Sequence, residues 1–441
     1  MIRSYAELLR LPGASAAAVP AALARLAGTM VPLALLLTLV RSGHSIAAGG
    51  AAGAAYALGG AVAGPALGRL MDRLGPAPVL RVTGPVAGLV LAWAAFGADG
   101  ASAAVLIGAA ATAGLATAPV GASVRAMWPG LTEDAALRQR AYSFEATLSE
   151  LLFILGPTAV TVLGSLVGAR PALLVTAVLL GTGALGYSQA GVVRRRRPQP
   201  RPPAPEGSGG PAGTGARRSG PSAASLSVLA AIALTAALSS ALAVAVTAAL
   251  RDQGSAAELA GSMVALQSAG SVLGGLLYGA RTPRGSTFRR YIRLLIVLAV
   301  ALAALPAVQL AHRAGLPSSW TLVALGALLV LTGLPIAPAG AEEFQLIGEM
   351  TAQQKMTQAF AGVGSFIAVG AAVGSAVAGL VAETLGPAVA LCLPALFTAL
   401  ALLVSLAARR PITAALAPAE QNAPGARLTP HPTPDIGDSH A

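Results

Sequence analysis

Long runs of apolar residues alternate with short polar segments along the chain. Each run reaches the roughly 20 residues that an α-helix needs to cross about 30 Å of hydrocarbon. Helix is the only open-chain structure that satisfies every backbone polar group in lipid, so each run predicts a membrane-spanning helix. The predicted helices form two sets of six, at residues 17–40, 44–70, 79–97, 101–124, 143–167 and 171–192, and at residues 225–250, 256–280, 292–311, 319–341, 357–383 and 387–407.

A segment of different composition separates the two sets. It begins with four consecutive arginines, Arg194 to Arg197, and continues mainly with Pro, Gly, Ser and Ala, a composition that cannot bury a core. The end of the chain has the same character. We therefore expect an all-α protein organised as an N-terminal bundle at 1–193, a disordered basic linker at 194–224, a C-terminal bundle at 225–408 and a disordered tail at 409–441.

Composition agrees with this membrane interpretation. Hydrophobic residues make up 55% of the 441 positions, charged residues only 10%, and the mean hydropathy is +0.72. Because about 25% of residues are charged in a typical soluble protein, this chain lacks the polar surface that soluble domains require. We expect a multi-pass protein of the cell membrane.

The distribution of basic residues predicts the orientation. The net charge is +12, with 29 basic residues. If the N-terminus is cytoplasmic, alternating spans leave only Arg41, Arg170, Arg251 and Arg313 outside, with Arg25 inside a span. Since basic residues favour the cytoplasmic side, both termini are expected there. The basic segments would contact anionic lipid, and nucleic acid is not an expected partner.

Several common chemistries are not supported. The only lysine, Lys355, follows Gln354, so no phosphate-binding G-x-x-x-x-G-K-[ST] loop exists and ATP binding is not expected. The four histidines are far apart and form no zinc motif. The single cysteine, Cys392, cannot form an intramolecular disulfide. We therefore expect no metal, no cofactor and no enzymatic activity.

The two sets of helices also resemble each other. Glycines spaced by four residues occur in the second span of each, at Gly60, Gly64 and Gly68 and again at Gly270 and Gly274. The separation of about 210 residues is typical of the parallel halves of a transporter.

A motif at the end of the second span is more specific. The residues Gly68-Arg69-Leu70-Met71-Asp72-Arg73-Leu74-Gly75 resemble the G-x-L-x-D-R-x-G loop of the major facilitator superfamily, although Pro76 and Ala77 replace its following basic residues. In that family the loop braces the outward-facing state across the two halves. The resemblance implies a gating role for Gly68, Asp72, Arg73 and Gly75. The alternative is an ordinary solvated turn.

A second motif lies in the fifth span. Gly156-Pro157 resembles the Gly-Pro motif of the family's fifth helix, which is characteristic of exporters. Proline removes a backbone donor and kinks the helix, while the glycine leaves room for a partner helix. The resemblance therefore implies a helix kink here and favours export.

One carboxyl group stands about two turns inside the fifth span. Glu150 is costly there when charged and should face a cavity or a partner, which suits reversible protonation. Arg25 in the first span is its expected partner, and together they are the candidates for proton coupling. A purely structural ion pair is the alternative. Glu145 is expected to face the headgroups instead.

Other polar residues in the spans are few. Arg125, followed by Trp128, is interpreted as an interfacial anchor, and Glu342 and Glu343 as solvated at the end of the tenth span. Small hydroxyls in membrane helices often bond their own backbone, which is the alternative to lining a cavity. The cavity-lining candidates are Thr235, Ser239, Gln267 and Thr332.

These observations predict a twelve-helix secondary transporter of the major facilitator type. Its few charged cavity residues favour a small apolar or amphipathic substrate, and the resemblance favours proton-coupled efflux. Two alternatives stay open: uptake or facilitated diffusion of a sugar or metabolite, and a membrane scaffold or sensor that does not transport.

Overall fold

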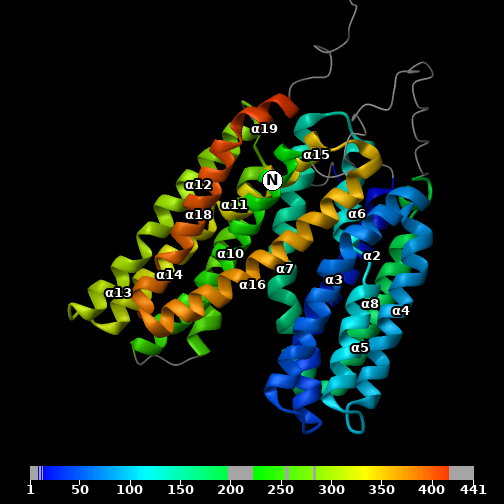
Figure 1. The fold of residues 1–441 in the computed structure, drawn as a ribbon, viewed down its shortest axis with the longest axis horizontal. Coiled ribbons are helices and arrows are strands. Elements are labelled where there is room, and N and C mark those ends of the chain that lie inside the picture. The colour runs from blue at the N-terminus through cyan, green and yellow to red at the C-terminus, as the bar shows by residue number, and fades with distance from the viewer. Residues whose placement is uncertain are drawn as a thin grey trace, which may run out of the picture.

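A computed structural model describes residues 8, 11, 13–196, 222–253, 258–281 and 285–416. Within these ranges the chain is helical and contains no strand. Twelve stretches are long and apolar enough to span a membrane, which confirms the predicted number. They form two bundles that lie side by side (Figure 1).

The N-terminal bundle contains the first six spans. The fourth span consists of two helices, α5 and α6, and the others of one helix each. In chain order the helices are α2 (Ala14–Arg41), α3 (Ile46–Leu74), α4 (Pro76–Gly97), α5 (Ala103–Ala116), α6 (Val120–Leu131), α7 (Ala135–Leu166) and α8 (Ala169–Gln189), followed by the short α9 (Gly191–Arg194).

The C-terminal bundle contains the other six spans, three of which are divided into two helices. They are α10 (Ala223–Asp252), α11 (Glu258–Gly279), α12 (Thr287–Ala303) with α13 (Leu305–Arg313), α14 (Ser318–Gly333) with α15 (Ile336–Met350), α16 (Met356–Thr384), which follows the 3-10 turn η1 (Gln353–Lys355), and α17 (Pro387–Ala390) with α18 (Leu393–Ala407).

The divided spans break beside prolines. Pro119 lies between α5 and α6 and directly precedes α6, and Pro335 lies between α14 and α15 at the corresponding place in the tenth span. Proline lacks the backbone donor that a continuous helix needs, so the break is a local consequence of the sequence. The matching breaks in the fourth and tenth spans add to the similarity between the two halves.

Three apolar cores show how the bundles meet. One core lies wholly in the N-terminal bundle, from Ala27 to Leu180, and one wholly in the C-terminal bundle, from Ala237 to Phe397. The third contains residues of both bundles. It lies at the end where α3, α7, α11 and α15 approach the connecting loops, and the bundles diverge toward the other end (Figure 1).

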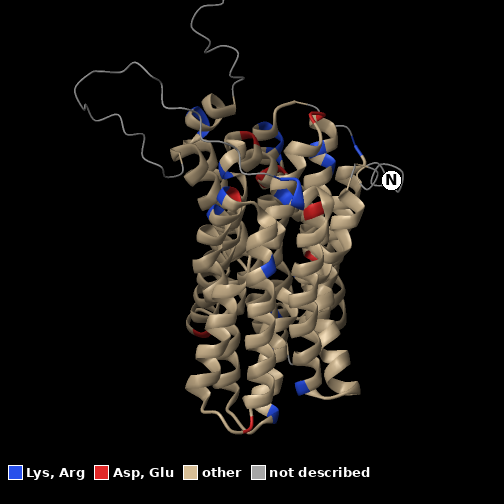
Figure 2. Ribbon diagram, turned by 90° about the vertical axis from the view of Figure 1, so that its right-hand side faces the viewer, with Lys and Arg blue, Asp and Glu red and all other residues tan. Residues whose placement is uncertain are grey.

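We call these two ends the linker end and the opposite end. The linker end carries α9, α19 (Arg409–Leu416) and the loop residues 75, 132–134, 280–281, 285–286 and 351–352. The opposite end carries those at 42–45, 98–102, 167–168, 314–317 and 385–386. Figure 2 shows that Lys, Arg, Asp and Glu gather toward the linker end, which is uppermost in the picture, and are few at the opposite end.

Two segments predicted as disordered are partly helical. Residues 409–416 of the predicted tail form α19, because Ile412 is fully buried and α19 packs on α10 and α15. At the linker's edges, α9 reaches Arg194 and the Ser222 side chain caps α10 by accepting from the Ser225 amide at 3.1 Å. The predicted linker residues 197–221 and tail residues 417–441 lie outside the described part.

Candidate functional site

The loop after α3 joins the two bundles at the linker end. Asp72 accepts hydrogen bonds from the first backbone amides of α16, Oδ1 from Thr357 at 3.1 Å and Oδ2 from Gln358 at 2.9 Å. These donors are unpaired within their own helix, and the positive end of the helix dipole favours a carboxylate there. The side chain of Asp72 is only 4% exposed. Asp72 therefore connects the two bundles and does not belong to a solvated turn.

Glycines make this contact possible. A Cβ at Gly68 would lie 2.9 Å from the Thr357 carbonyl oxygen, so any larger residue would push α16 away. Gly75 has φ +85°, a conformation that side chains disfavour, and it allows the turn into α4. Arg73 differs from the other motif residues: it is exposed and forms no ion pair with a described residue. The cation near Asp72 is Arg196, at 3.7 Å.

A second polar connection lies between α7 and the C-terminal bundle. Glu342 of α15 is fully buried and pairs with Arg290 at 2.9 Å. It also accepts from Tyr278 at 2.5 Å and, across the bundle interface, from Gln139 Nε2 at 3.2 Å. One turn further along α7, the Ser143 hydroxyl donates to the Gly275 carbonyl at 2.9 Å. The expectation that Glu342 is solvated is wrong, because three side chains donate four hydrogen bonds to its carboxylate.

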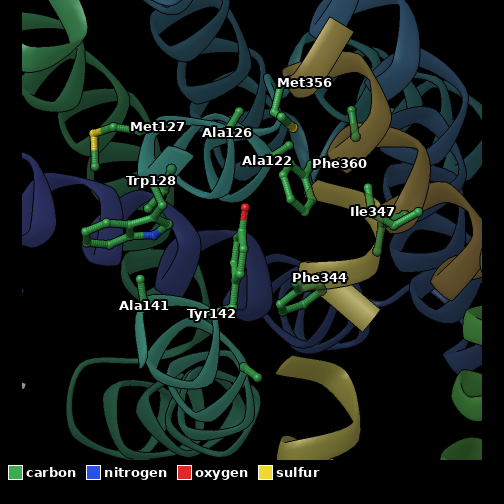
Figure 3. Packing of buried hydrophobic residues seen from close by; sticks show 14 of the residues in the cluster. Ala122, Ala126, Met127, Trp128, Ala141, Tyr142, Phe344, Ile347, Met356 and Phe360 are labelled. Atoms are coloured by element: carbon green, nitrogen blue, oxygen red, sulfur yellow. The ribbon is translucent and has the colours of Figure 1, made fainter. Parts of the chain in front are cut away.

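Aromatic side chains fill the interface between these connections. Figure 3 shows Tyr142 with Trp128 on one side and Phe344 and Phe360 on the other. The Tyr142 and Phe360 rings are 5.9 Å apart and the Phe344 and Phe360 rings 6.3 Å. This packing excludes water, so the linker end is closed in the structure.

Four polar residues form a buried cluster on the α2 side of α7. Arg25 pairs with Glu145 at 2.9 Å and donates to the Ser149 hydroxyl, also at 2.9 Å. Arg125 donates to the same hydroxyl at 3.2 Å and lies 4.0 Å from the centre of the Phe344 ring. We call Arg25, Arg125, Glu145 and Ser149 the arginine cluster.

Two sequence-based interpretations change with this geometry. Arg25 contacts Glu145, and not Glu150, because positions five residues apart lie on different faces of a helix and α2 packs on the face of 145, 149, 152 and 156. Glu145 is 2% exposed and does not face headgroups. Arg125 is a member of the cluster, and not an interfacial anchor.

Glu150 lies on a different face of α7. Its helical register continues Ser143 and Thr147, which both contact α11 at Gly275. Glu150 is half-buried and forms no hydrogen bond or ion pair with the described residues. It lies about one turn beyond Thr147 along α7, toward the opposite end.

The Gly156-Pro157 motif lies inside the unbroken helix α7. A Cβ at Gly156 would overlap the Thr29 hydroxyl, which donates to the Leu152 carbonyl at 3.0 Å. Gly156 is therefore a close-packing position between α2 and α7.

The four cavity-lining candidates lie in different surroundings. Thr235 donates to Glu343 at 3.1 Å, and Ser239 is exposed one turn further along α10. Gln267 is 6% exposed, and its Nε2 has no partner among the described residues. Thr332 is fully buried and bonds the Leu329 carbonyl of its own helix, so it lines no open space.

Glu343 is also buried, contrary to expectation. Its carboxylate accepts from the Tyr291 and Thr235 hydroxyls, each at 3.1 Å, inside the C-terminal bundle. No ion pair of Glu343 is found among the described residues.

A cavity of about 160 Å³ lies beside Arg25 in the N-terminal bundle. It is located where the fourth span breaks, and Arg25 and Thr117 are its polar residues. The remaining lining is apolar: Ala24, Gly28, Gly84, Ala87, Ala118, Val120, Leu180 and Ala184. Over the same described ranges, no three His, Cys, Asp or Glu residues gather as metal ligands would.

Comparison with known proteins agrees with this architecture. Residues 18–235 match the family profile of the Major Facilitator Superfamily. The chain belongs to this superfamily. It is therefore a multi-pass integral membrane protein and a transporter. No curated protein matches the sequence.

Solved structures show the same fold over nearly the whole chain. A human organic anion transporter, MFSD10 (TETRAN), is 16% identical, with a TM-score of 0.68 over 89% of this chain and 98% of that one. A bacterial homologue of the iron transporter ferroportin, in an outward-facing state, is 13% identical, with a TM-score of 0.68 over 90% and 99%. At these identities the likeness concerns the fold alone.

Proposed function

We propose that this transporter exports a small amphipathic compound in exchange for protons by alternating access. In the cycle the two bundles rock about the site between them, so that each end opens in turn. The separate cores of the two bundles support this idea, because each bundle can move as a unit without losing its own packing.

The observation that carries the proton coupling is the position of Glu150. A carboxyl group in a membrane span without an ionic partner favours its neutral form, and contact with a cation or water favours its charged form. Glu150 continues the helical register of Ser143 and Thr147, which contact α11 of the other bundle, so rocking should change the surroundings of this face of α7. The Arg25–Glu145 pair, by contrast, lies within one bundle and keeps its geometry.

The orientation is part of the proposal. Arg69, Arg73, Arg81, Arg138 and Arg140 flank the linker-end loops of the N-terminal bundle, and basic residues favour the cytoplasmic side. The linker end would then be cytoplasmic and the described conformation outward-facing. Protease should cut the linker at 197–221 in inside-out vesicles but not in intact cells, and cleavage from outside would contradict this orientation.

The coupling is tested in proteoliposomes with an imposed pH gradient and a panel of lipophilic dyes, organic anions, sugars and amino acids. The Glu150→Gln variant keeps the shape of the side chain and removes its titration. We expect it to lose accumulation against a gradient and to keep substrate exchange, which needs rocking but no net proton movement. Glu383→Gln, at the exposed end of α16, is the matched control and should transport normally.

The outcomes separate the alternatives. Accumulation that persists in Glu150→Gln with unchanged pH dependence would show that Glu150 is not the coupling residue. Accumulation of a sugar along its own gradient without pH dependence would favour uptake or facilitated diffusion. A wild-type protein that moves no compound of the panel would favour a scaffold or sensor.

A further inference from the structure

The arginine cluster contains more positive than negative charge. Arg25 and Arg125 both donate to Ser149, so their guanidinium groups are close together, and Glu145 is the one carboxylate that pairs with either among the described residues. Glu145 offsets one cation. The Phe344 ring, which forms a cation–π contact with Arg125, attracts the guanidinium group less strongly than an anion would.

The other titratable groups nearby do not supply the missing negative charge. Tyr142 of α7, which also faces Arg125, is a neutral phenol near pH 7. Glu150 makes no contact with either arginine, and α2, α4 and α8 contribute no carboxylate to the surroundings of Arg25. The Nε of Arg125 is buried and without a partner among the described residues. An uncompensated cation at this depth is unfavourable unless an anion joins it.

The cavity beside Arg25 provides space for such an anion. Its volume of about 160 Å³ is much larger than the roughly 10–15 Å³ that one water requires. Arg25 and Thr117 line it together with apolar residues, most of them small, from α2, α4 and α8. A cation at one side and an apolar wall elsewhere fit a carboxylate attached to a short hydrophobic body.

We propose that the arginine cluster and the adjoining cavity bind an amphipathic organic anion, with its carboxylate at the excess positive charge of the cluster and its apolar part in the cavity. Because this deepens the proposed transport function by naming the substrate class, it depends on that function only for the step of translocation. Binding itself needs neither a gradient nor Glu150. It can therefore be measured separately on the purified protein.

The test compares binding of benzoate with that of its neutral analogue benzamide, by calorimetry and thermal stabilisation of the full chain in detergent. Acetate and naphthoate vary the apolar part, and chloride and sulfate test for an inorganic anion. We expect benzoate to bind at least about tenfold more tightly than benzamide, since a charged hydrogen bond is stronger than a neutral one. Naphthoate or benzoate should bind more tightly than acetate.

Variants test whether the positive charge that binds benzoate belongs to the arginine cluster. Arg125→Gln removes the excess cation and keeps the Arg25–Glu145 pair. It should therefore weaken benzoate binding by about tenfold and leave the affinity for benzamide unchanged. Arg125→Lys keeps the charge and should retain most of the benzoate affinity. Arg170→Gln, at the opposite end, is the matched control. The lysine variant and the unchanged benzamide affinity distinguish loss of charge from loss of folding.

Four results would overturn the proposal. Benzoate and benzamide could bind equally, or all the carboxylates could fail to bind. Benzoate affinity could be unchanged in Arg125→Gln. Binding of chloride or sulfate without any carboxylate would assign the cluster to an inorganic anion instead. If carboxylates bind as expected while Glu150→Gln still couples normally, the anion site stands and only the proton-coupling proposal fails.

Discussion

The linker end and the opposite end of the molecule are held together in different ways. At the linker end, Asp72 and Gln139 each form hydrogen bonds from the N-terminal bundle to the C-terminal bundle. At the opposite end, the described ion pairs remain within one bundle: Arg170 with Asp99, and Arg313 with Asp252. The N- and C-terminal bundles are thus joined at one end and independent at the other.

This difference indicates which contacts can change during transport. The separate cores keep each bundle folded when the linker end opens. The connections that must break are hydrogen bonds, some of them to backbone amides, and the apolar packing of the core that both bundles share. Each such hydrogen bond contributes only about 1 kcal/mol net, and charged ones about 1.5–3 kcal/mol, so the polar connections alone do not lock the closed form.

The largest expected effect comes from blocking closure of the linker end. Gly68→Leu places a side chain against the backbone of Thr357 and Gln358, which cannot move aside without displacing α16. Overpacking of this kind costs about 3 kcal/mol, which lowers the population of the closed form by about two orders of magnitude. Transport should fall accordingly.

The closed form can be followed by cross-linking cysteines at Gly130 and Gln353. A Cβ at Gly130 would lie 3.6 Å from Gln353 Nε2 across the interface, and Cys392→Ser removes the native thiol. Gly50→Leu, in the same helix at the opposite end with no atom near its Cβ, is the control. Efficient cross-linking in Gly68→Leu would contradict the steric role of Gly68.

A smaller effect is expected from Asp72→Asn. The amide oxygen still accepts one hydrogen bond, but the charge that interacts with the α16 terminus is lost. We expect the closed form to lose about 1–2 kcal/mol, and transport to fall by about tenfold. Asp99→Asn, which changes an exposed carboxylate at the opposite end, should have little effect on either measurement. Wild-type transport in Asp72→Asn would argue against gating.

The spans themselves could be predicted from the sequence, because each crosses the membrane as one apolar run. The partner of Arg25 could not. Glu145 and Glu150 are both acidic and only five residues apart in α7, and the choice between them depends on the face of α7 that α2 covers. Gly156, which lies on the same face of α7 as Glu145 and packs on Thr29 of α2, is the sequence signal that could decide it.

The hydrogen-bonded surroundings of Glu342 could not be predicted from the sequence for a related reason. Its position near the end of an apolar span is compatible with solvent, and its donors Gln139, Tyr278 and Arg290 come from three other helices. Only the packing of the bundles brings them together. The second half thus has a buried carboxylate on α15 that bonds to the other bundle, where the first half has Asp72 at the end of α3.

The smallest expected effect concerns the hydrogen bond between Gln139 and Glu342. Gln139→Leu removes the interbundle donor and leaves Arg290 and Tyr278 on Glu342, so the carboxylate stays compensated. The loss of one hydrogen bond should destabilise the closed form by about 1 kcal/mol. Cross-linking between positions 130 and 353 should then fall by about fivefold. Gln253→Leu is the counterpart at the opposite end, where Gln253 bonds Gln309 within one bundle at 2.8 Å. It should reduce the thermal stability of the C-terminal bundle without altering the cross-link. If the two variants changed cross-linking equally, the connection through Glu342 would not belong to the gate, and Asp72 would be the main polar contact that holds the linker end closed.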